Sequence, residues 1–175
     1  MGSVIWSGNV DELEDMAEAI YQMGANEIAW SWIMKAGRAK EHPEIWVPEE
    51  RYWEVGNRLR AMRDRFAGKM KLNYHRFRLL TDESVGCQGG KRFLHISPEG
   101  HLSPCSWIAK LDPRYVSEGT IYDSSIDELM KEGHIQAFRE MVNQREIEYG
   151  PGCPAVCLIK NGTPFSQDPL YVGKK

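Results

Sequence analysis

The chain has 175 residues, of which 42% are apolar and 27% are charged. This balance is typical of a folded domain and argues against a wholly disordered chain. The formal net charge is −3, so there is no broad basic field to bind nucleic acid or an anionic membrane surface. We find no apolar run of membrane-spanning length and no export signal, and we therefore expect a cytoplasmic location.

The first part of the chain has the pattern of a βαβ unit. Residues 3–6 are a candidate strand, and apolar residues then recur at helical spacing between Asn9, an expected N-cap, and Gly24, an expected helix end. Residues 28–34 form a near-continuous apolar run, typical of a strand that is buried on both faces of a parallel sheet. Strand, helix and strand follow one another here at the spacing of a parallel crossover unit.

A second helix and a third strand extend this pattern. Pro48 suits the first position of a helix, an apolar stripe follows it, and Gly68 ends it. Residues 71–74 are a weaker strand candidate. The first strand would then have an unpaired outer edge near the start of the chain, and such edges are a liability. We therefore expect the sheet to continue in sequence that lies N-terminal to this chain.

The second half begins with a predicted β-hairpin over residues 87–105. The tetrapeptide at positions 97–100, Ser-Pro-Glu-Gly, has the signature of a type I turn. Folding at this turn brings Cys87 and Cys105 roughly opposite each other, so the hairpin has a thiol at each base.

Helical signals follow the hairpin. Ser125 and Glu128 form a capping-box pattern, which predicts a short helix that breaks at Gly133 and resumes through Val142. The tail from Asn161 contains Gly, Pro and Ser, and we expect it to be surface coil.

The four cysteines of the chain all lie in its second half, as Cys87, Cys105, Cys153 and Cys157. In a chain without an export signal, clustered cysteines bind metal more often than they form disulfides. Thiolates are soft donors that select zinc or an iron–sulfur cluster. Zinc sites usually have two short Cys knuckles, whereas the first pair here has seventeen residues between its cysteines. The wide pair favours a bulkier iron–sulfur cubane, but zinc and uninvolved or redox-active thiols remain open.

At this point the sequence resembles a known family. Cys87, Gly100 and Cys105 form the pattern Cys-x12-Gly-x4-Cys, which is followed by Gly-x-Ile-Tyr-Asp-Ser-Ser-Ile-Asp-Glu-Leu and by a late, short Cys pair. This combination resembles the C-terminal extension of radical S-adenosylmethionine (SAM) enzymes. The extension occurs as a full SPASM domain with two auxiliary clusters or as a truncated "twitch" domain with one. Residues 7–39 resemble late strands of the partial (β/α)6 barrel of the same enzymes.

The resemblance implies an α/β chain in which residues 1–80 are late βα units of the partial barrel and residues 81–175 are a small α+β twitch or SPASM-like domain with a β-hairpin. It implies that the four cysteines bind one auxiliary [4Fe–4S] cluster, which transfers electrons to or from a substrate radical. The SAM-cleaving motif Cys-x3-Cys-x2-Cys is absent. SAM binding would therefore require an N-terminal half of the barrel, in the same or another chain, and we do not expect this chain to be active alone.

The resemblance does not choose among a peptide, a tetrapyrrole and a small molecule as the substrate. From the net charge and the lack of a long apolar run, we expect neither a nucleic-acid nor a membrane partner. Two alternatives from other classes remain: a non-catalytic four-cysteine zinc module that serves as an interaction scaffold, and an electron-transfer protein unrelated to a radical SAM barrel.

Two further pairs of residues have open roles. Trp30 and Trp32 share one face of their strand, where they either line the barrel interior or pack beneath the helices. Lys91 and Arg92 follow Cys87 closely and would raise the potential of a cluster if they pointed inward; otherwise they are solvated charges.

Overall fold

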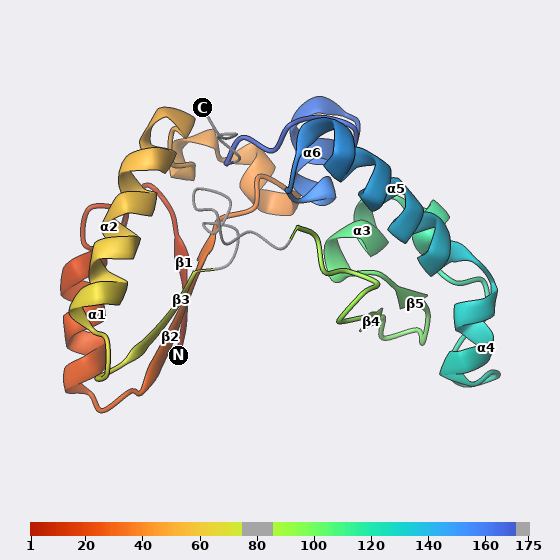
Figure 1. Cartoon of the computed structure of the whole chain (residues 1–175), viewed down its shortest axis with the longest axis horizontal. Helices are drawn as coiled ribbons and strands as arrows, with labels where there is room; N and C mark the ends of the chain where they lie inside the picture. The colour runs from red at the N-terminus through yellow and green to blue at the C-terminus, as the bar shows by residue number, and fades with distance from the viewer. Residues whose placement is uncertain (75–85, 171–175) are drawn as a thin grey trace. The chain divides into compact units, whose positions relative to one another are not determined.

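The computed structural model describes residues 1–74 and 86–170, and these two stretches belong to two separate compact units (Figure 1). Both units combine helices and strands, which confirms the mixed α/β class. Within these described stretches, no helix has the length and apolarity needed to cross a membrane.

The first unit is a three-stranded parallel sheet with two crossover helices. Its regular elements are β1 (Gly2–Ile5), α1 (Leu13–Gln22), β2 (Glu27–Trp32), the short 3-10 helices η1 (Gly37–Glu41), η2 (Pro43–Ile45) and η3 (Glu49–Arg51), α2 (Tyr52–Arg65) and β3 (Lys71–Tyr74). The strand order is β1-β2-β3, with Ile5 opposite Trp32 and Ile28 opposite Leu72. The predicted alternation of strands and helices is therefore confirmed. Figure 1 shows α1 and α2 on the same side of the sheet.

Along β2, buried residues alternate with half-buried ones, so only one face of the strand is fully buried. Ile28, Trp30 and Trp32 are buried, whereas the residues between them are half-buried. The expectation of a strand buried on both faces was thus wrong within this unit, because α1 and α2 cover the same face. The Trp32 ring lies 4.4 Å from the ring of Tyr52 in α2, measured between centroids. Trp30 and Trp32 therefore pack beneath the helices.

The predicted N-cap of α1 was wrong. The Asn9 side chain instead accepts a hydrogen bond from the N–H of Trp6 (3.0 Å) and donates one to the carbonyl of Val4 (2.9 Å). The helix begins four residues later, with Glu12 at the N-cap position. Asn side chains often bond nearby backbone in this way, which competes with capping a helix. Pro48 likewise precedes η3, so that α2 starts at Tyr52.

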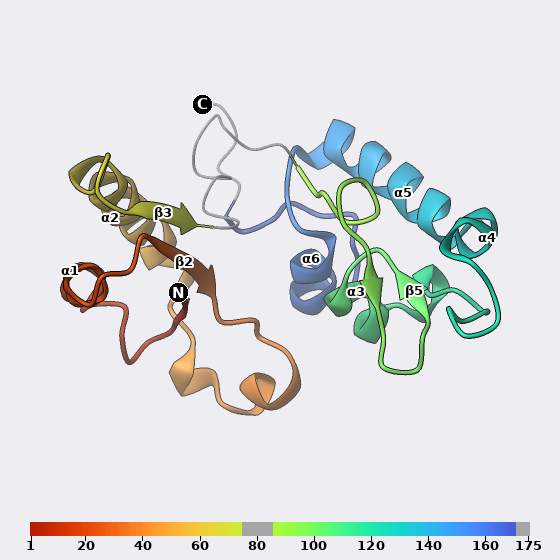
Figure 2. The same cartoon turned by 90° about the horizontal axis from the view of Figure 1, so that it is seen from below.

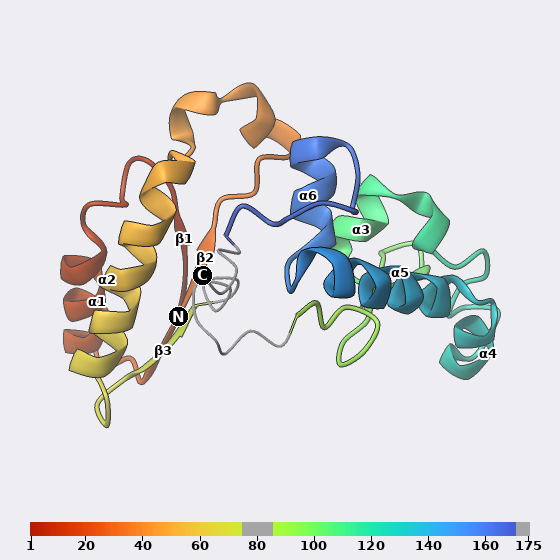
Figure 3. The same cartoon turned by 45° about the horizontal axis from the view of Figure 1, so that its top comes forward.

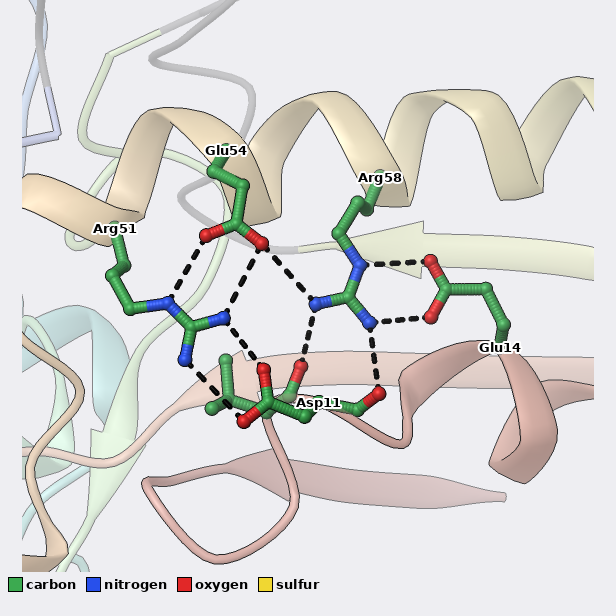
Figure 4. Close-up of polar contacts among 6 residues, drawn as sticks. Asp11, Glu14, Arg51, Glu54 and Arg58 are labelled. Carbon is green, nitrogen blue, oxygen red and sulfur yellow. Dashed lines mark hydrogen bonds and ion pairs between the residues drawn. The ribbon is translucent and has the colours of Figure 1, made fainter.

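Two arginines of the α2 region join this helix to the loop and first turn of α1 (Figure 4). Arg58 makes a bidentate pair with Glu14 and donates to the carbonyl of Val10 at 2.8 Å. Arg51 pairs with Asp11 at 2.6 Å and with Glu54 at 3.0 Å. Bidentate pairs are the geometrically specific kind of ion pair, so this network fixes how α2 lies against α1.

We expect the stability of the first unit to fall below pH 4.5, and to fall less in a Glu14→Gln variant. The Arg58 guanidinium holds the pKa of the Glu14 carboxyl below its ordinary value of 4.5. Since the folded-state pKa is the lower one, the unfolded chain binds more protons. The contribution is therefore complete above the ordinary value and is lost as the pH falls through the folded-state pKa.

Urea unfolding at a series of pH values measures this effect by tryptophan fluorescence, since five of the six tryptophans lie in residues 1–74. Asp15→Asn, at an exposed position next along α1, is the matched control. An equal pH slope in the wild type and Glu14→Gln would contradict the prediction.

Helices make up most of the regular structure of the second unit, which also has a small hairpin (Figure 2). Its elements are β4 (His95–Ile96), β5 (Leu102–Ser103), α3 (Ser106–Leu111), the 3-10 helix η5 (Pro113–Tyr115), α4 (Ile126–Lys131), α5 (His134–Tyr149) and α6 (Pro154–Asn161). β4 and β5 are antiparallel, and the N–H of Gly100 donates to the carbonyl of Ser97 at 2.9 Å. The predicted hairpin and its turn are confirmed, although each strand has only two residues.

The sequence signals predicted some of the helices of this unit and missed others. The capping box of Ser125 and Glu128 is present at the start of α4, and Gly133, with φ of +90°, separates α4 from α5 as predicted. Helices α3 and α6 were missed. Pro154 occupies the first turn of α6, a position that proline favours, so this helix had a signal in the sequence.

The core of this unit lies between α3, η5, α5 and α6. Its buried apolar members are Ile108, Tyr115, Phe138, Met141, Val142 and Ala155. Near the end of the described chain, Asp168 and Leu170 are fully buried. The stretch after α6 is irregular, as expected, but the expectation that it lies at the surface was wrong at Asp168 and Leu170, which pack into the unit.

Candidate metal centre

Three of the four cysteines gather at the core of the second unit. Cys87, Cys105 and Cys153 are free thiols, each half-buried, and all three pack against the same apolar cluster. Besides burial, the nearby Cys153 thiol raises the pKa of both Cys87 and Cys105, and the Cys105 thiol raises that of Cys87. The two ends of the hairpin segment and a loop far downstream thus converge.

Two short helices bring these thiols together. Cys105 directly precedes α3 and Cys153 directly precedes α6. These helices contact each other, as Figure 3 also shows. On the side of Cys87, a Cβ at Gly89 would lie 3.1 Å from the carbonyl oxygen of Pro104 and 3.6 Å from the Cys87 sulfur. Glycine therefore allows the Cys87 segment to approach the residue before Cys105.

Cys157 has different surroundings. It is buried in α6, and its N–H donates to the carbonyl of Cys153, so the two are i,i+4 neighbours on one helix face. Its sulfur accepts a hydrogen bond from Arg145 (3.4 Å) and donates one to the carbonyl of Ser166 (3.3 Å). Asp168 also acts on it electrostatically. The structure thus brings three cysteines together and places the fourth one helical turn from Cys153, beside a buried arginine.

Burial favours the protonated form of the Cys87, Cys105 and Cys157 thiols, because it raises the pKa of each. Desolvation raises the pKa of Cys87 to about 12 and also raises the pKa of Cys105. It raises the pKa of Cys157 too, although the Arg145 guanidinium opposes this shift. Since thiolates are the form that binds metal, loading such a site must release protons.

Two carboxylates hold the backbone of the cysteines in place. Glu146 of α5 accepts a hydrogen bond from the N–H of Cys87, and Asp168 accepts one from the N–H of Cys153, each at 2.8 Å. Sequence analysis missed both, as well as Arg145. Nothing local distinguishes these residues, because each meets its cysteine only through tertiary folding. The role of Lys91 was open in the sequence analysis. Its Nζ lies 3.9 Å from Oε2 of Glu146, with which it forms an ion pair.

The donors fit an iron–sulfur cluster chemically. Three soft sulfur atoms lie against an apolar core, and the backbone N–H of Ile108 donates a hydrogen bond to the sulfur of Cys105 at 3.4 Å. Such amide bonds and burial are the features that tune protein-bound clusters. Among residues 1–74 and 86–170, no group of three or more His, Cys, Asp or Glu side chains lies close enough together to hold a single metal ion.

Comparison with known families favours an iron–sulfur centre over a zinc site. A family model described as an iron–sulfur cluster-binding domain, SPASM, matches residues 87–157, which begin and end at the first and last of the four cysteines. The second unit contains a SPASM domain. This match supports an auxiliary-cluster role for residues 87–157.

A curated relative extends the similarity beyond the SPASM domain. PqqA peptide cyclase from Ruegeria pomeroyi is 24% identical over 183 residues, an alignment that covers 97% of this chain and 48% of the relative. The chain thus spans about half the length of that relative. Both findings confirm the resemblance to the C-terminal part of a radical SAM enzyme with a SPASM domain.

We expect a Gly152→Ala variant to destabilise the SPASM domain and to lower its iron content. A Cβ at this position would lie 2.5 Å from a terminal nitrogen of Arg145 and 2.7 Å from the Cβ of Asp168. Both side chains contact cysteines, so their displacement disturbs the site. Overpacking of this kind typically costs about 1–3 kcal/mol.

Thermal unfolding and iron analysis of the anaerobically purified protein measure the two effects. Gly2→Ala is the control, since a Cβ there meets nothing within 4 Å. Wild-type stability and iron in Gly152→Ala would show that the space around Arg145 is not confined.

Proposed function

We propose that this chain binds one auxiliary [4Fe–4S] cluster through Cys87, Cys105, Cys153 and Cys157, as part of a radical SAM enzyme. The observation that carries the proposal is the convergence of three thiols on one apolar core inside the SPASM match. When bound, such a cluster supplies one-electron transfer to or from a substrate radical. With four protein ligands it has no open iron position, which favours electron transfer over direct binding of the substrate.

The chain's own residues would hold the cluster and keep water away from it. The apolar cluster that includes Ile108 and Phe138 covers the thiols on one side. Glu146 and Asp168 fix the backbone at Cys87 and Cys153. Outer contacts of this kind orient ligands, and their loss typically costs about 10–100-fold in metal affinity. Cys157, on the same helix face as Cys153, would supply the fourth sulfur ligand.

The first unit fits the role of late βα units in a partial (β/α)6 barrel. Three parallel strands with helices on one face support this assignment, and we propose residues 1–80 as the barrel part and residues 81–175 as the cluster domain. SAM would bind with an N-terminal half of the barrel, supplied by the same or another chain. Among the substrate classes considered, the name of the cyclase relative favours a peptide.

Anaerobic purification of the chain tests the proposal directly. We expect a brown protein with broad visible absorption and about four iron and four sulfide per chain, as a single cubane requires. Electron paramagnetic resonance after reduction should give the signal of one cluster.

A colourless protein with one zinc per chain would remove this proposal and establish the zinc scaffold instead. A brown protein whose reduced cluster transfers no electron to a small redox dye would support cluster binding. The same result would rule out the electron-transfer role.

A further inference from the structure

We propose that Arg145 is a positioning residue for the auxiliary cluster: it holds the sulfur of Cys157, and its buried positive charge raises the reduction potential of the cluster. This inference rests on the proposed function, since it concerns a cluster bound by these thiols.

The burial of Arg145 is the first observation. Its side chain is fully inaccessible to solvent within the second unit. Its terminal nitrogens donate to the carbonyls of Gly150 and Ser166, each at 3.0 Å, and to the sulfur of Cys157 at 3.4 Å. Its Nε–H has no hydrogen-bond partner among the described residues. A buried cation is costly unless an anion faces it.

Cys157 is the acceptor that can become that anion. The two carbonyl oxygens bonded by Arg145 are neutral, whereas a thiol becomes a thiolate when it binds metal. The hydrogen bond from Arg145 to this sulfur then becomes charge-assisted, and such bonds are roughly twice as strong as neutral ones. A bound cluster would thus complete the charge balance of the arginine.

Asp168 is the other charged group beside Cys157. Its two oxygens accept hydrogen bonds from the N–H groups of Cys153 and Leu170. Asp168 therefore holds the backbone at the start of α6, while Arg145 holds a sulfur one turn later. Gly152 lies within contact distance of both side chains, so the arginine and the carboxylate support the same helix end from two directions.

A fixed positive charge near a cluster favours its reduced form, because reduction adds a negative charge. The low dielectric of a buried site increases this effect. Hydrogen bonds to the ligand sulfurs act in the same direction. Arg145 supplies both influences through one side chain.

The test compares the wild type with Arg145→Gln and Arg145→Lys in the anaerobically purified whole chain. We measure iron and sulfide per chain, and then the midpoint potential by electron paramagnetic resonance during a redox titration. We expect a lower midpoint potential in Arg145→Gln, and a return toward the wild-type value in Arg145→Lys, which restores the charge. Arg114→Gln is the control, because that arginine is 73% exposed and pairs with Asp112.

The outcomes separate this inference from the proposed function. A wild type without an iron–sulfur cluster overturns the proposed function. A loaded wild type and a loaded Arg145→Gln variant with equal potentials overturn the role of Arg145 alone. Loss of the cluster in Arg145→Gln with its retention in Arg145→Lys supports the charge requirement. Loss of helical circular dichroism in both variants makes Arg145 a structural residue only and also overturns the inference.

Discussion

Replacing Cys105 with alanine should lower the iron bound per chain by more than tenfold. Cys105 lies at the point where the hairpin segment meets α3, and its thiol interacts with that of Cys153 and packs against the apolar core. Loss of an outer partner alone typically costs about 10–100-fold in metal affinity. Loss of a direct sulfur ligand should cost at least as much. Iron and sulfide analysis after anaerobic reconstitution measures the effect.

The neighbouring Ser106→Ala is the matched control, since it makes a small change at an exposed position of the same helix start. The Cys105 sulfur also accepts a hydrogen bond from the N–H of Ile108, so circular dichroism must show that the fold persists. Full iron in Cys105→Ala would remove this residue from the ligand set.

The same measurement on Cys157→Ala decides the fourth ligand. If Cys157 binds the cluster, its loss should lower iron as strongly as the loss of Cys105. Wild-type iron in Cys157→Ala alone would leave a centre held by the three cysteines that the structure brings together.

The largest loss of stability is expected from Phe138→Ala in the second unit. Phe138 of α5 is fully buried, and its ring lies 5.2 Å from that of Tyr115 in an edge-to-face arrangement. Truncation of a buried phenylalanine typically costs about 3–5 kcal/mol, because the cavity left behind collapses only partly. Since the cysteines pack against the same cluster, the iron content should fall as well.

Hydrogen exchange of α5 amides in the whole chain reports the change in this unit. Ile147→Ala is a matched control on the same helix, because Ile147 is 88% exposed. Equal protection in Phe138→Ala and Ile147→Ala would contradict the assignment of Phe138 to the core.

Local patterns predicted much of the architecture. Apolar spacing and glycine stops predicted the strand–helix alternation of the first unit, and the Ser125–Glu128 capping box predicted the start of α4. The Ser97–Gly100 turn and the two cysteines around it predicted the hairpin. Each of these signals arises from residues close together in sequence, where dihedral preference and local hydrogen bonds decide the outcome.

Two other local signals led to wrong expectations. Asn9 carried a capping preference, yet its side chain bonds the backbone of Val4 in β1 and of Trp6 just after that strand. The composition of the tail predicted coil at the surface, yet Asp168 and Leu170 are buried. At Asn9 a competing bond to nearby backbone outweighed the capping preference. At Asp168 a contact with Cys153, far away in the sequence, outweighed the local composition.

From the sequence alone came the four thiols, their soft-metal chemistry and the Cys-x12-Gly-x4-Cys spacing that the SPASM match later supported. Only the tertiary structure decided which thiols pack against the same apolar cluster and which charged groups support them. The reason is that α3, α5 and α6 meet through burial of apolar surface and not through neighbouring sequence. Arg145, Glu146 and Asp168 reach their cysteines across 12, 59 and 15 positions of the chain. Contacts of that separation depend on the packed core as a whole.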